Sequence, residues 1–347
     1  MPVSDTLDRL AFGAAQAARF SWFFGQGLLA GRLVKPTPTP PELKGRMPAT
    51  ASLLKDLGGL MARDYAHIAA GRYAAPDERP GNPVAALKRA RDFFRDLRLV
   101  DRRRQAAQHQ EVSQDHAGDG LPRYYLQNFH YQTDGWLSRR SAELYDHQVE
   151  VLFMGCADAM RRQALVPLGA EIARLGQRQA RLIDIACGTG RFLRSVKANW
   201  PRLAVAGLDL SPFYLDKTRA TLAEWSGVRT IEAAAEQVPE PDGGFDLGTV
   251  IYLFHELPPP ARRRVAAELA RLIRPGGLLV LVDSIQIGDF AGYDALLEIF
   301  PVKFHEPYFT SYIREDLVTL FAEAGFVLES TERAFLSKVM AFRRAAA

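Results

Sequence analysis

The sequence predicts an α/β protein: a mostly parallel sheet of seven strands with helices on both faces, preceded by a helical N-terminal extension. Two observations carry this prediction. From about residue 178 onward, short apolar runs alternate with stretches of helical spacing, which is typical of a parallel sheet covered on both faces. Before that point the chain, 347 residues in all, shows mainly helical patterns, so we expect the extra length to form helices outside the sheet.

The N-terminal extension, residues 1–120, is predicted to contain two clear helices. Residues 51–70 and 84–98 place apolar side chains at helical spacing. The stretch KPTPTPPELKGRMP, within the linker at residues 35–48, is rich in proline, which favours an extended linker over a helix. Residues 100–120 are polar, and we expect a loop there.

Residues 10–33 are the most apolar stretch of the chain. Gln16, Arg19 and Gln26 interrupt it, and its four glycines weaken it as a helix. It therefore falls short of the ~18 clean apolar residues that a membrane-spanning helix needs. Three alternatives stay open: packing on the core, covering a hydrophobic pocket, or weak association with a membrane surface.

Charge and cysteine content exclude other classes. Residues 1–120 hold 18 basic against 13 acidic residues, and the whole chain has a net charge of +4. This excess lacks the dense basic stripe of nucleic-acid-binding proteins, so we expect no nucleic-acid partner. Two cysteines are too few for a disulfide framework, and the N-terminus lacks the basic region of a signal peptide. We expect a soluble, cytoplasmic protein, with a peripheral membrane location as the alternative.

The remaining chain divides into a cap segment, residues 121–177, and a sheet domain, residues 178–347. In the cap, aromatic rings interleave with polar side chains before a helical stretch begins. The last two strands of the sheet domain follow each other closely, which predicts a final hairpin and one antiparallel edge strand. The predicted strands are 181–186, 203–210, 228–233, 245–254, 277–284, 326–332 and 338–344, and the helices lie near 190–200, 212–226, 259–273 and 313–324.

A ligand is expected where the first strand ends. The sequence LIDIACGTGRF, residues 182–192, is an apolar run that breaks into small residues, and such a turn lets the backbone approach a ligand closely. The dinucleotide pattern G-x-G-x-x-G needs a third glycine, but Leu193 occupies that position. Asp209 follows Gly190 by 19 residues, a spacing at which a carboxylate accepts hydrogen bonds from ribose hydroxyls. The ligand is therefore expected to carry a ribose without a pyrophosphate.

At this point the sequence resembles the class I S-adenosylmethionine-dependent methyltransferases, in the small-molecule branch similar to ubiquinone and menaquinone methyltransferases. The resemblance lies in DIACGTG (184–190), GLDLS (207–211), AAEQVP (234–239), FDLGTVIYLFHEL (245–257) and LIRPGGLLVLVD (272–283). It implies a Rossmann-like fold and S-adenosyl-L-methionine as cofactor. The cofactor-binding residues that it implies are Asp184, Ala186, Cys187, Gly188, Thr189, Gly190, Asp209, Leu210, Ala235, Glu236 and Ile251.

One position departs from the family. Relatives usually carry an acid where this chain has Ala234, so backbone amides are expected to replace that side chain at the adenine. Asp184 as a purely structural acid and Asp209 as a helix cap are the alternatives to their ligand roles. Ser211, just before Pro212, suits the cap better.

Methyl transfer needs a general base only when the acceptor must lose a proton. The candidate catalytic residues are His255 and Tyr252, after the fourth strand, and His130 in the cap segment. The alternative for His255 is that it only orders its loop. No pair of histidines or cysteines has metal-ligand spacing, so no metal site is predicted. Further candidates are Tyr124, Tyr125, Tyr131, His147, His305, Tyr308 and Tyr312.

The leading hypothesis is methyl transfer, to oxygen or carbon, on a small and largely apolar acceptor. Residues 121–165 and 286–312 are rich in aromatic residues, and we expect them to cap the cofactor edge of the sheet and form the acceptor pocket. Two alternatives remain: an NAD(P)-dependent oxidoreductase, and a non-catalytic cofactor-binding scaffold. The sequence identifies neither the acceptor nor the oligomeric state.

Overall fold

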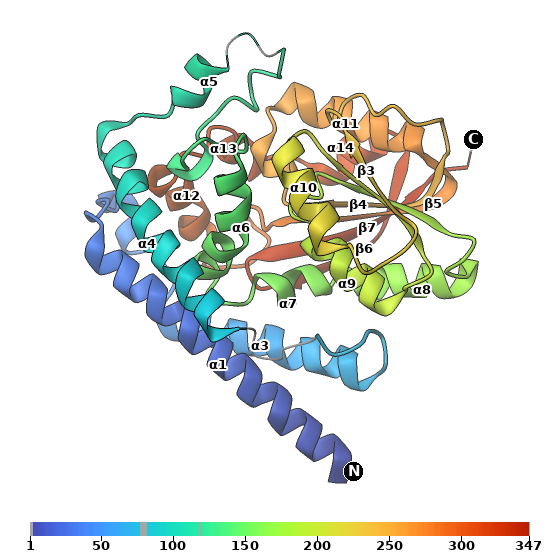
Figure 1. Cartoon of the computed structure of the whole chain (residues 1–347), viewed down its shortest axis with the longest axis horizontal. Helices are drawn as coiled ribbons and strands as arrows, with labels where there is room; N and C mark the ends of the chain where they lie inside the picture. The colour runs from blue at the N-terminus through green and yellow to red at the C-terminus, as the bar shows by residue number, and fades with distance from the viewer. Residues whose placement is uncertain (1–2, 77–81, 117, 119, 347) are drawn as a thin grey trace.

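The computed structural model describes residues 3–76, 82–116, 118 and 120–346. In this part of the chain, seven strands form one sheet in the order β3-β2-β1-β4-β5-β7-β6, with helices packed on both faces (Figure 1). The predicted α/β class and the mostly parallel sheet are confirmed.

The first four strands pair in parallel and were each predicted from their apolar runs: β1 (Arg181–Ile185), β2 (Ala204–Asp209), β3 (Val228–Glu232) and β4 (Phe245–Ile251). The side chains of β1 alternate between two apolar clusters, one on each face of the sheet. Strands buried on both faces must be apolar throughout, which is why they read as continuous hydrophobic runs. Their parallel pairing brings the carboxyl ends of all four strands to one edge.

The final hairpin is confirmed, but its antiparallel strand does not lie at the edge. Strand β7 (Ser337–Arg344) pairs antiparallel with both β5 (Ile273–Ser284) and β6 (Phe326–Ala334), and so lies between them. Burial explains this order. The β7 side chains are almost all buried, whereas the middle of β6 is exposed and carries Glu329 and Glu332. Charged side chains are tolerated on an edge strand and help to keep it from pairing with other chains.

Helices cover the two faces of the sheet in separate groups. Each group buries an apolar stripe in its own cluster of core residues. On one face lie α11 (Pro259–Leu272), α12 (Asp294–Lys303), α13 (Phe309–Tyr312) and α14 (Leu317–Glu323). On the other lie α8 (Leu165–Leu175), α9 (Arg191–Asn199) and α10 (Pro212–Thr221).

Helix α1 (Val3–Leu33) is continuous over 31 residues despite its four glycines. A glycine inside a helix costs about 0.5–1 kcal/mol, and tertiary contacts offset that cost. The guanidinium Nε of Arg19 donates to the carbonyl oxygen of Gly155 at 2.7 Å, and the Gln26 amide oxygen lies 2.8 Å from Nε2 of His147. His147 belongs to α6 (Arg139–Leu152), on which α1 packs (Figure 1).

The rest of the extension is more helical than predicted. Helix α3 (Thr50–Ala69) matches the prediction, but α2 (Pro41–Lys44) interrupts the expected linker, because proline fits the first position of a helix. Helix α4 (Pro83–Ala106) continues past residue 98, and α5 (Glu111–Asp115) follows it. The predicted loop at 100–120 is therefore largely wrong. Arginine has a high helix propensity, which carries α4 through Arg102–Arg104.

The cap segment contains η1 (Phe129–Tyr131), α6, α7 (Ala157–Arg162) and α8. A comparable short turn, η2 (Phe254–Glu256), lies in the sheet domain. None of the helices in the described ranges combines the length and hydropathy that a membrane span requires.

Candidate functional site

The turn after β1 adopts the tight conformation that its small residues predict. Ala186, Gly188 and Gly190 all have positive φ angles, of 57°, 57° and 74°. A Cβ on Gly190 would lie 3.0–3.1 Å from atoms of Thr218, so only glycine fits there. At Gly188 a Cβ would meet nothing within 4 Å, because this side of the turn faces an open space. The turn thus exposes backbone to a ligand on one side and packs on α10 on the other.

Asp209 ends β2 directly beside this turn. Its Oδ2 accepts the backbone N–H of Gly188 at 2.9 Å, and its Oδ1 accepts that of Ser211 at 2.9 Å. Burial raises the pKa of Asp209 to about 6, against the effect of these amide hydrogen bonds. Each carboxylate oxygen keeps a lone pair for a further donor. The helix cap is provided instead by Ser211, whose hydroxyl accepts from the backbone N–H of Tyr214 at 3.4 Å.

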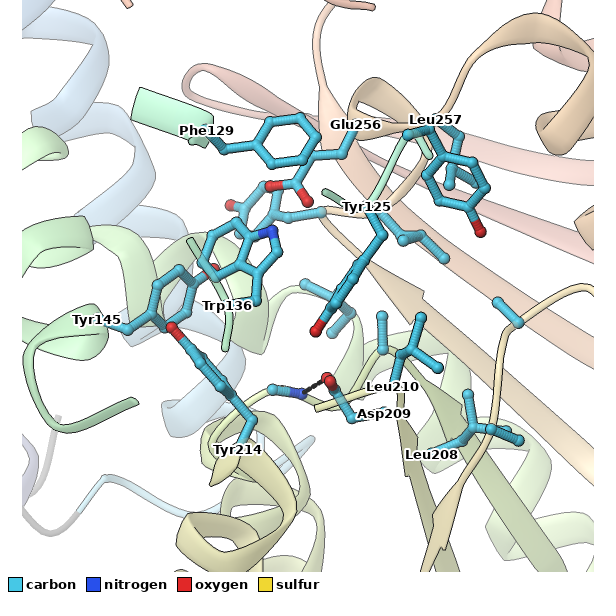
Figure 2. Close-up of a pocket in the computed structure, with 18 residues that line it drawn as sticks. Tyr125, Phe129, Trp136, Tyr145, Leu208, Asp209, Leu210, Tyr214, Glu256 and Leu257 are labelled. Carbon is cyan, nitrogen blue, oxygen red and sulfur yellow. Dashed lines mark hydrogen bonds between the residues drawn. The ribbon is translucent and has the colours of Figure 1, made fainter. Parts of the chain in front are cut away.

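An open cavity lies over this edge of the sheet, with about 780 Å³ of empty space when the solvent at its mouth is included (Figure 2). Its floor is the turn and the ends of β2, β3 and β4, and its roof is a group of aromatic rings from the cap segment. Figure 2 shows Asp209 on the floor, with Tyr125, Trp136 and Tyr145 around the space above it. The lining residues on the floor are Ala186, Gly188, Leu208, Asp209, Leu210, Ala233, Ala235, Ile251 and Tyr252.

This cavity brings together about half of the cofactor-binding residues expected from the sequence. Six of them line it: Ala186, Gly188, Asp209, Leu210, Ala235 and Ile251. The others, Asp184, Cys187, Thr189, Gly190 and Glu236, are not among its lining residues.

The side chains of the second group have partners elsewhere. The Asp184 carboxylate is 2% exposed and accepts the Thr249 hydroxyl at 2.6 Å inside the sheet, and burial raises its pKa to about 7. The Thr189 hydroxyl donates to Asp146 on α6 at 2.8 Å. Cys187 packs against Gly207 in the core, where burial raises the pKa of its thiol well above the ordinary value. This is the environment of a structural cysteine, not of a nucleophile.

Glu236 also faces away from the cavity lining and holds the cap. Its Oε2 accepts the hydroxyl of Tyr124 at 2.6 Å, and its Oε1 pairs with Arg264 at 3.3 Å. The adjacent Ala235 does line the cavity. In this chain the AAEQVP stretch therefore offers the cavity an apolar surface and uses its acid to anchor Tyr124.

The roof comes mainly from the aromatic segment expected to cap the cofactor edge of the sheet, although Trp136, Tyr145 and Tyr214 were not among the predicted site residues. Trp136, Tyr145 and Tyr214 meet edge to face with ring centroids 5.3–5.7 Å apart, a geometry that aromatic pairs prefer. The Tyr214 hydroxyl lies 2.9 Å from that of Ser141, joining α10 to the cap. The hydroxyl of Tyr125 is buried at the cavity and finds no hydrogen-bond partner among the described residues. A buried polar group without a partner is costly, so it suits a ligand atom.

A second and larger open cavity, about 1390 Å³ with the solvent at its mouth included, adjoins the first. The two share Trp136, Tyr145, Tyr252 and Glu256. Its remaining walls are mostly apolar and come from elements far apart in the chain. They include Gly27, Ala30, Gly31 and Val34 from α1 and its end, Phe93, Leu97 and Val100 from α4, Val149, Val151 and Leu152 from α6, and Phe300 and Phe304 from α12 and its end.

The three catalytic candidates, His255, Tyr252 and His130, all line this second cavity. Nε2 of His130 lies 2.9 Å from Oε1 of Glu306, which is fully buried. Tyr252 has a positive φ of 59°, and its hydroxyl lies 2.9 Å from that of Ser337. Burial raises the pKa of Tyr252, so this phenol stays protonated near neutral pH. His130, Tyr252 and His255 thus bring polar groups to the wall of a mostly apolar cavity.

His255 is held by Asp283, which ends β5. Its Nδ1 lies 2.6 Å from Oδ1 of Asp283, whose other oxygen accepts the backbone N–H groups of Phe254 and His255. Burial would lower the pKa of His255, but the Asp283 carboxylate raises it to about 9. The arrangement fixes the imidazole and orders the loop at once, so the geometry is compatible with both alternatives for His255.

Glu256 occupies the boundary between the two cavities. Burial raises its pKa well above the ordinary value, although the neighbouring His255 opposes this effect. Its Oε1 lies 3.9 Å from Nε2 of His255. A carboxyl group and an imidazole thus face the junction where a donor and an acceptor would meet.

Two of the remaining candidate histidines have structural roles. His147 lies between Phe23 and Phe93, and burial lowers its pKa to about 4. His305 stacks on His109 with ring centroids 4.2 Å apart, and burial lowers its pKa to about 4 as well. In residues 3–76, 82–116, 118 and 120–346, no group of three or more His, Cys, Asp or Glu side chains could hold a metal ion.

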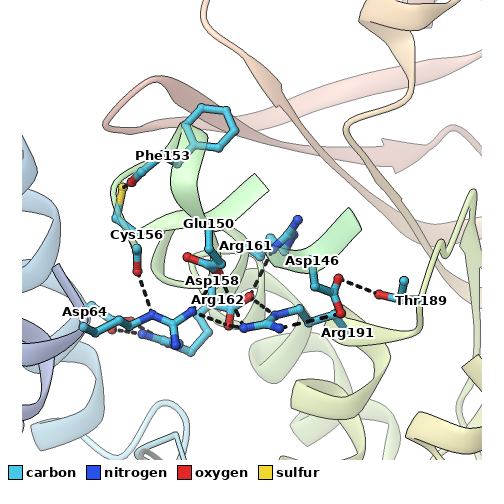
Figure 3. Close-up of polar contacts among 12 residues, drawn as sticks. Asp64, Asp146, Glu150, Phe153, Cys156, Asp158, Arg161, Arg162, Thr189 and Arg191 are labelled. Atoms are coloured by element: carbon cyan, nitrogen blue, oxygen red, sulfur yellow. Dashed lines mark hydrogen bonds and ion pairs between the residues drawn. The ribbon is translucent and has the colours of Figure 1, made fainter. Parts of the chain in front are cut away.

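An ionic network joins the turn to the helical extension (Figure 3). Arg191, the first residue of α9, donates to Asp158 of α7 at 2.6 and 2.7 Å. Arg19 of α1 pairs with Glu150 at 2.7 Å and with Asp158 at 3.3 Å. Deeper in, Arg162 binds the fully buried Asp64 of α3. The extension is therefore attached to the site by buried, charge-assisted hydrogen bonds.

Comparisons with known proteins agree with this geometry. Residues 182–277 match the model of a family described as a methyltransferase domain. Residues 182–277 therefore carry a methyltransferase domain. The methyl donor of such domains is S-adenosylmethionine.

The methyltransferase domain also accounts for the sequence relatives. A demethylmenaquinone methyltransferase of Deinococcus radiodurans is 32% identical over 143 residues, which cover 41% of this chain and 56% of the relative. The Thermus thermophilus protein of the same name is 35% identical over 41% of this chain and 61% of its own length. The 27-O-demethylrifamycin SV methyltransferase of Amycolatopsis mediterranei is 34% identical over 33% of this chain and 42% of its own. The chain thus matches only about half the length of these relatives.

Solved structures give a weaker likeness. The YcgJ protein from Bacillus subtilis superimposes with a TM-score of 0.40 at 15% identity, covering 52% of this chain and 98% of that one.

Proposed function

We propose that this protein transfers a methyl group from S-adenosylmethionine to the oxygen or carbon of a small, largely apolar organic acceptor. The observation that carries the proposal is the pair of adjoining cavities. One contains Asp209 and the turn at 186–190, and the other is larger and mostly apolar. A donor and an acceptor bound in them would meet at Tyr252 and Glu256, which line both.

The residues of the first cavity fit the cofactor. Asp209 would accept hydrogen bonds from the ribose hydroxyls, and the open side of Gly188 leaves room for close backbone approach. Ala235 and Leu210 would pack on the adenine, and the unpartnered hydroxyl of Tyr125 would gain a partner. When bound, the cofactor supplies an electrophilic methyl group on a sulfonium.

Three further positions expected at the cofactor support the site in this proposal without lining the cavity. Asp184 supports the end of β1 from inside the sheet, Thr189 fastens the turn to α6, and Gly190 provides close packing on Thr218. Cys187 fills the space beneath the turn.

The residues of the second cavity would orient the acceptor. Its apolar walls exclude water and hold an apolar body, while His255, His130 and Tyr252 present polar groups in its wall. Alignment of the reacting atoms can itself lower the barrier by several kcal/mol. If the acceptor carries an acidic hydroxyl or carbon, His255 would receive its proton, with Asp283 holding the imidazole in place.

The first experiment is calorimetry with S-adenosylmethionine, S-adenosylhomocysteine and NAD. We expect binding of the first two and none of the third; NAD binding alone would support an oxidoreductase instead. The second is mass spectrometry of the protein isolated directly from cells, to identify a retained acceptor, followed by detection of a product heavier by one methyl group. Cofactor binding without turnover over a broad panel of acceptors would support a scaffold role.

A peripheral membrane location is the finer part of the proposal. The extension contributes four residues of α1 and its end to the acceptor cavity, so residues 10–33 cover a hydrophobic pocket with one face. The opposite face of the same helix is free to contact a membrane surface, with the acceptor as a small-molecule partner taken from it.

A further inference from the structure

The outward face of α1 is apolar. Its large aliphatic and aromatic side chains on that side are between 38% and 64% exposed. Isolated exposed leucines are ordinary on protein surfaces, but a row of them along one helix is not. The residues of this apolar row are Leu7, Leu10, Trp22, Leu28, Leu29 and Leu33.

The outward face of α4 is basic. Its exposed side chains recur every three or four residues, so they share one face of the helix. They form a basic stripe made of Lys88, Arg91, Arg95, Arg98 and Arg102. Asp92, beside this stripe, pairs with Arg91 at 2.8 Å and offsets one charge. At the start of the helix, Val84 is 71% and Leu87 is 61% exposed.

The two helices that carry these faces adjoin. Helices α1 and α4 touch each other, and both pack on α6. In Figure 1 they run side by side along one flank of the molecule, away from the sheet. Because each helix turns its buried side to α6, the apolar row and the basic stripe both point away from the body.

We propose that this flank, the apolar row of α1 with the basic stripe of α4, docks on a membrane rich in anionic lipids. Apolar side chains at the level of the headgroups, flanked by arginine and lysine, are the composition of an interfacial binding surface. A nucleic acid would also meet the basic stripe, but it offers nothing to a row of leucines. The flank therefore fits a lipid surface better than a polyanion in solution.

The position of the acceptor cavity supports this occupant. Gly27, Ala30 and Gly31 of α1 and Leu97 and Val100 of α4 all line it. The cavity therefore reaches the two helices that carry the proposed docking surface. An apolar acceptor dissolved in the bilayer could enter between them without crossing water; this part rests on the proposed methyltransferase function.

The test uses the full-length chain and vesicles of phosphatidylcholine with or without phosphatidylglycerol. We expect co-sedimentation with the anionic vesicles, weakened by salt, and little with neutral ones. Anionic vesicles should also change the fluorescence of Trp22, which is 38% exposed. Two variants remove the two halves of the surface: Leu28→Glu with Leu29→Glu, and Arg91→Gln with Arg95→Gln and Arg98→Gln. Each should lower the apparent affinity at least about tenfold.

Matched controls make the same chemical changes elsewhere. Val318→Glu with Val327→Glu replaces two exposed aliphatic residues on α14 and β6. Arg178→Gln with Arg194→Gln and Arg202→Gln removes three exposed charges of the sheet domain. Both controls should keep vesicle binding. Equal losses in controls and variants, or no binding by the unchanged chain, would overturn the proposal.

Two further outcomes are separable from these. If the α1 and α4 variants instead abolish a dimer seen by light scattering, a second copy covers this flank and the membrane assignment is wrong. Calorimetry with S-adenosylhomocysteine on every variant tests the proposed function independently. Binding of anionic vesicles without binding of the cofactor would support the docking surface and contradict the methyltransferase function. Binding of the cofactor without binding of vesicles would support the function and contradict the docking surface.

Discussion

The two adjoining cavities are built in different ways. The floor of the first comes from short motifs at the ends of neighbouring strands, with Asp209 and the turn at 186–190 only a few residues from regular β-structure. The second takes its walls from α1, α4, α6 and α12, which are separated by up to 270 residues in the chain. Parallel pairing forces the first arrangement, whereas the second depends on how an added helical layer packs. On the proposed function, the sheet would hold the cofactor and the extension would help to select the acceptor.

The largest expected effect tests the boundary between the two cavities. If His255 receives the acceptor's proton, His255→Gln should lower turnover by ~10²–10⁴-fold while cofactor affinity persists. The pKa of His255 is raised to about 9, so the neutral, proton-accepting form increases as the pH rises toward 9. Turnover of the unchanged enzyme should rise over that range, and the variant should lack this dependence. Full activity of His255→Gln would assign His255 to loop ordering and leave His130 as the next residue to test.

A substitution on the floor should affect the cofactor alone. Asp209→Ala removes charge-assisted hydrogen bonds worth ~1.5–3 kcal/mol each, so affinity for S-adenosylhomocysteine should fall at least tenfold by calorimetry. Asp209 also accepts the backbone N–H groups of Gly188 and Ser211. The variant Asp209→Asn keeps one acceptor oxygen and serves as a comparison. Thermal unfolding curves of both variants show whether the turn is disrupted or only the ligand contact is lost. An unchanged affinity would contradict the ribose assignment.

A substitution in the wall of the second cavity should have the opposite selectivity. A side chain at Gly31 would extend into free space, since a Cβ there meets nothing within 4 Å. Gly31→Leu should raise the KM for the acceptor roughly tenfold, by filling volume that the acceptor needs, and leave cofactor binding unchanged. Gly25→Leu is the matched control, because Gly25 is exposed on the same helix and does not line the cavity. Equal effects of the two changes would remove α1 from the acceptor site.

The smallest effect sharpens the role of the roof. Tyr214→Phe removes the hydrogen bond to Ser141 that joins α10 to the cap, which costs ~0.5–1.5 kcal/mol. Cofactor affinity should fall by up to about tenfold in calorimetry, with acceptor KM changed little. A larger effect on the acceptor than on the cofactor would show that the roof belongs to the second cavity.

Sequence patterns identified the sheet because its strands obey a local rule. From residue 178 onward the short apolar runs form strands. The small residues after β1 form a tight turn, so the positions of Gly188, Gly190 and Asp209 could be predicted. Ser211 could likewise be identified as a cap from Pro212 alone. These features depend on backbone conformation and on burial on both faces, which a short stretch of residues determines.

Tertiary structure decided where side chains point and what the helices cover. Asp184 and Thr189 lie close to the turn after β1 in the sequence, yet one bonds inside the sheet and the other to α6. The basic stripe of α4 does not form a run in the sequence, because its basic residues are three or four positions apart. They share one face only once the helix forms. The antiparallel strand β7 lies inside the sheet, although it comes last in the chain, because its apolar side chains are buried there. Contacts between α1, α4 and the strand ends are non-local, so only the folded chain brings those residues around one cavity.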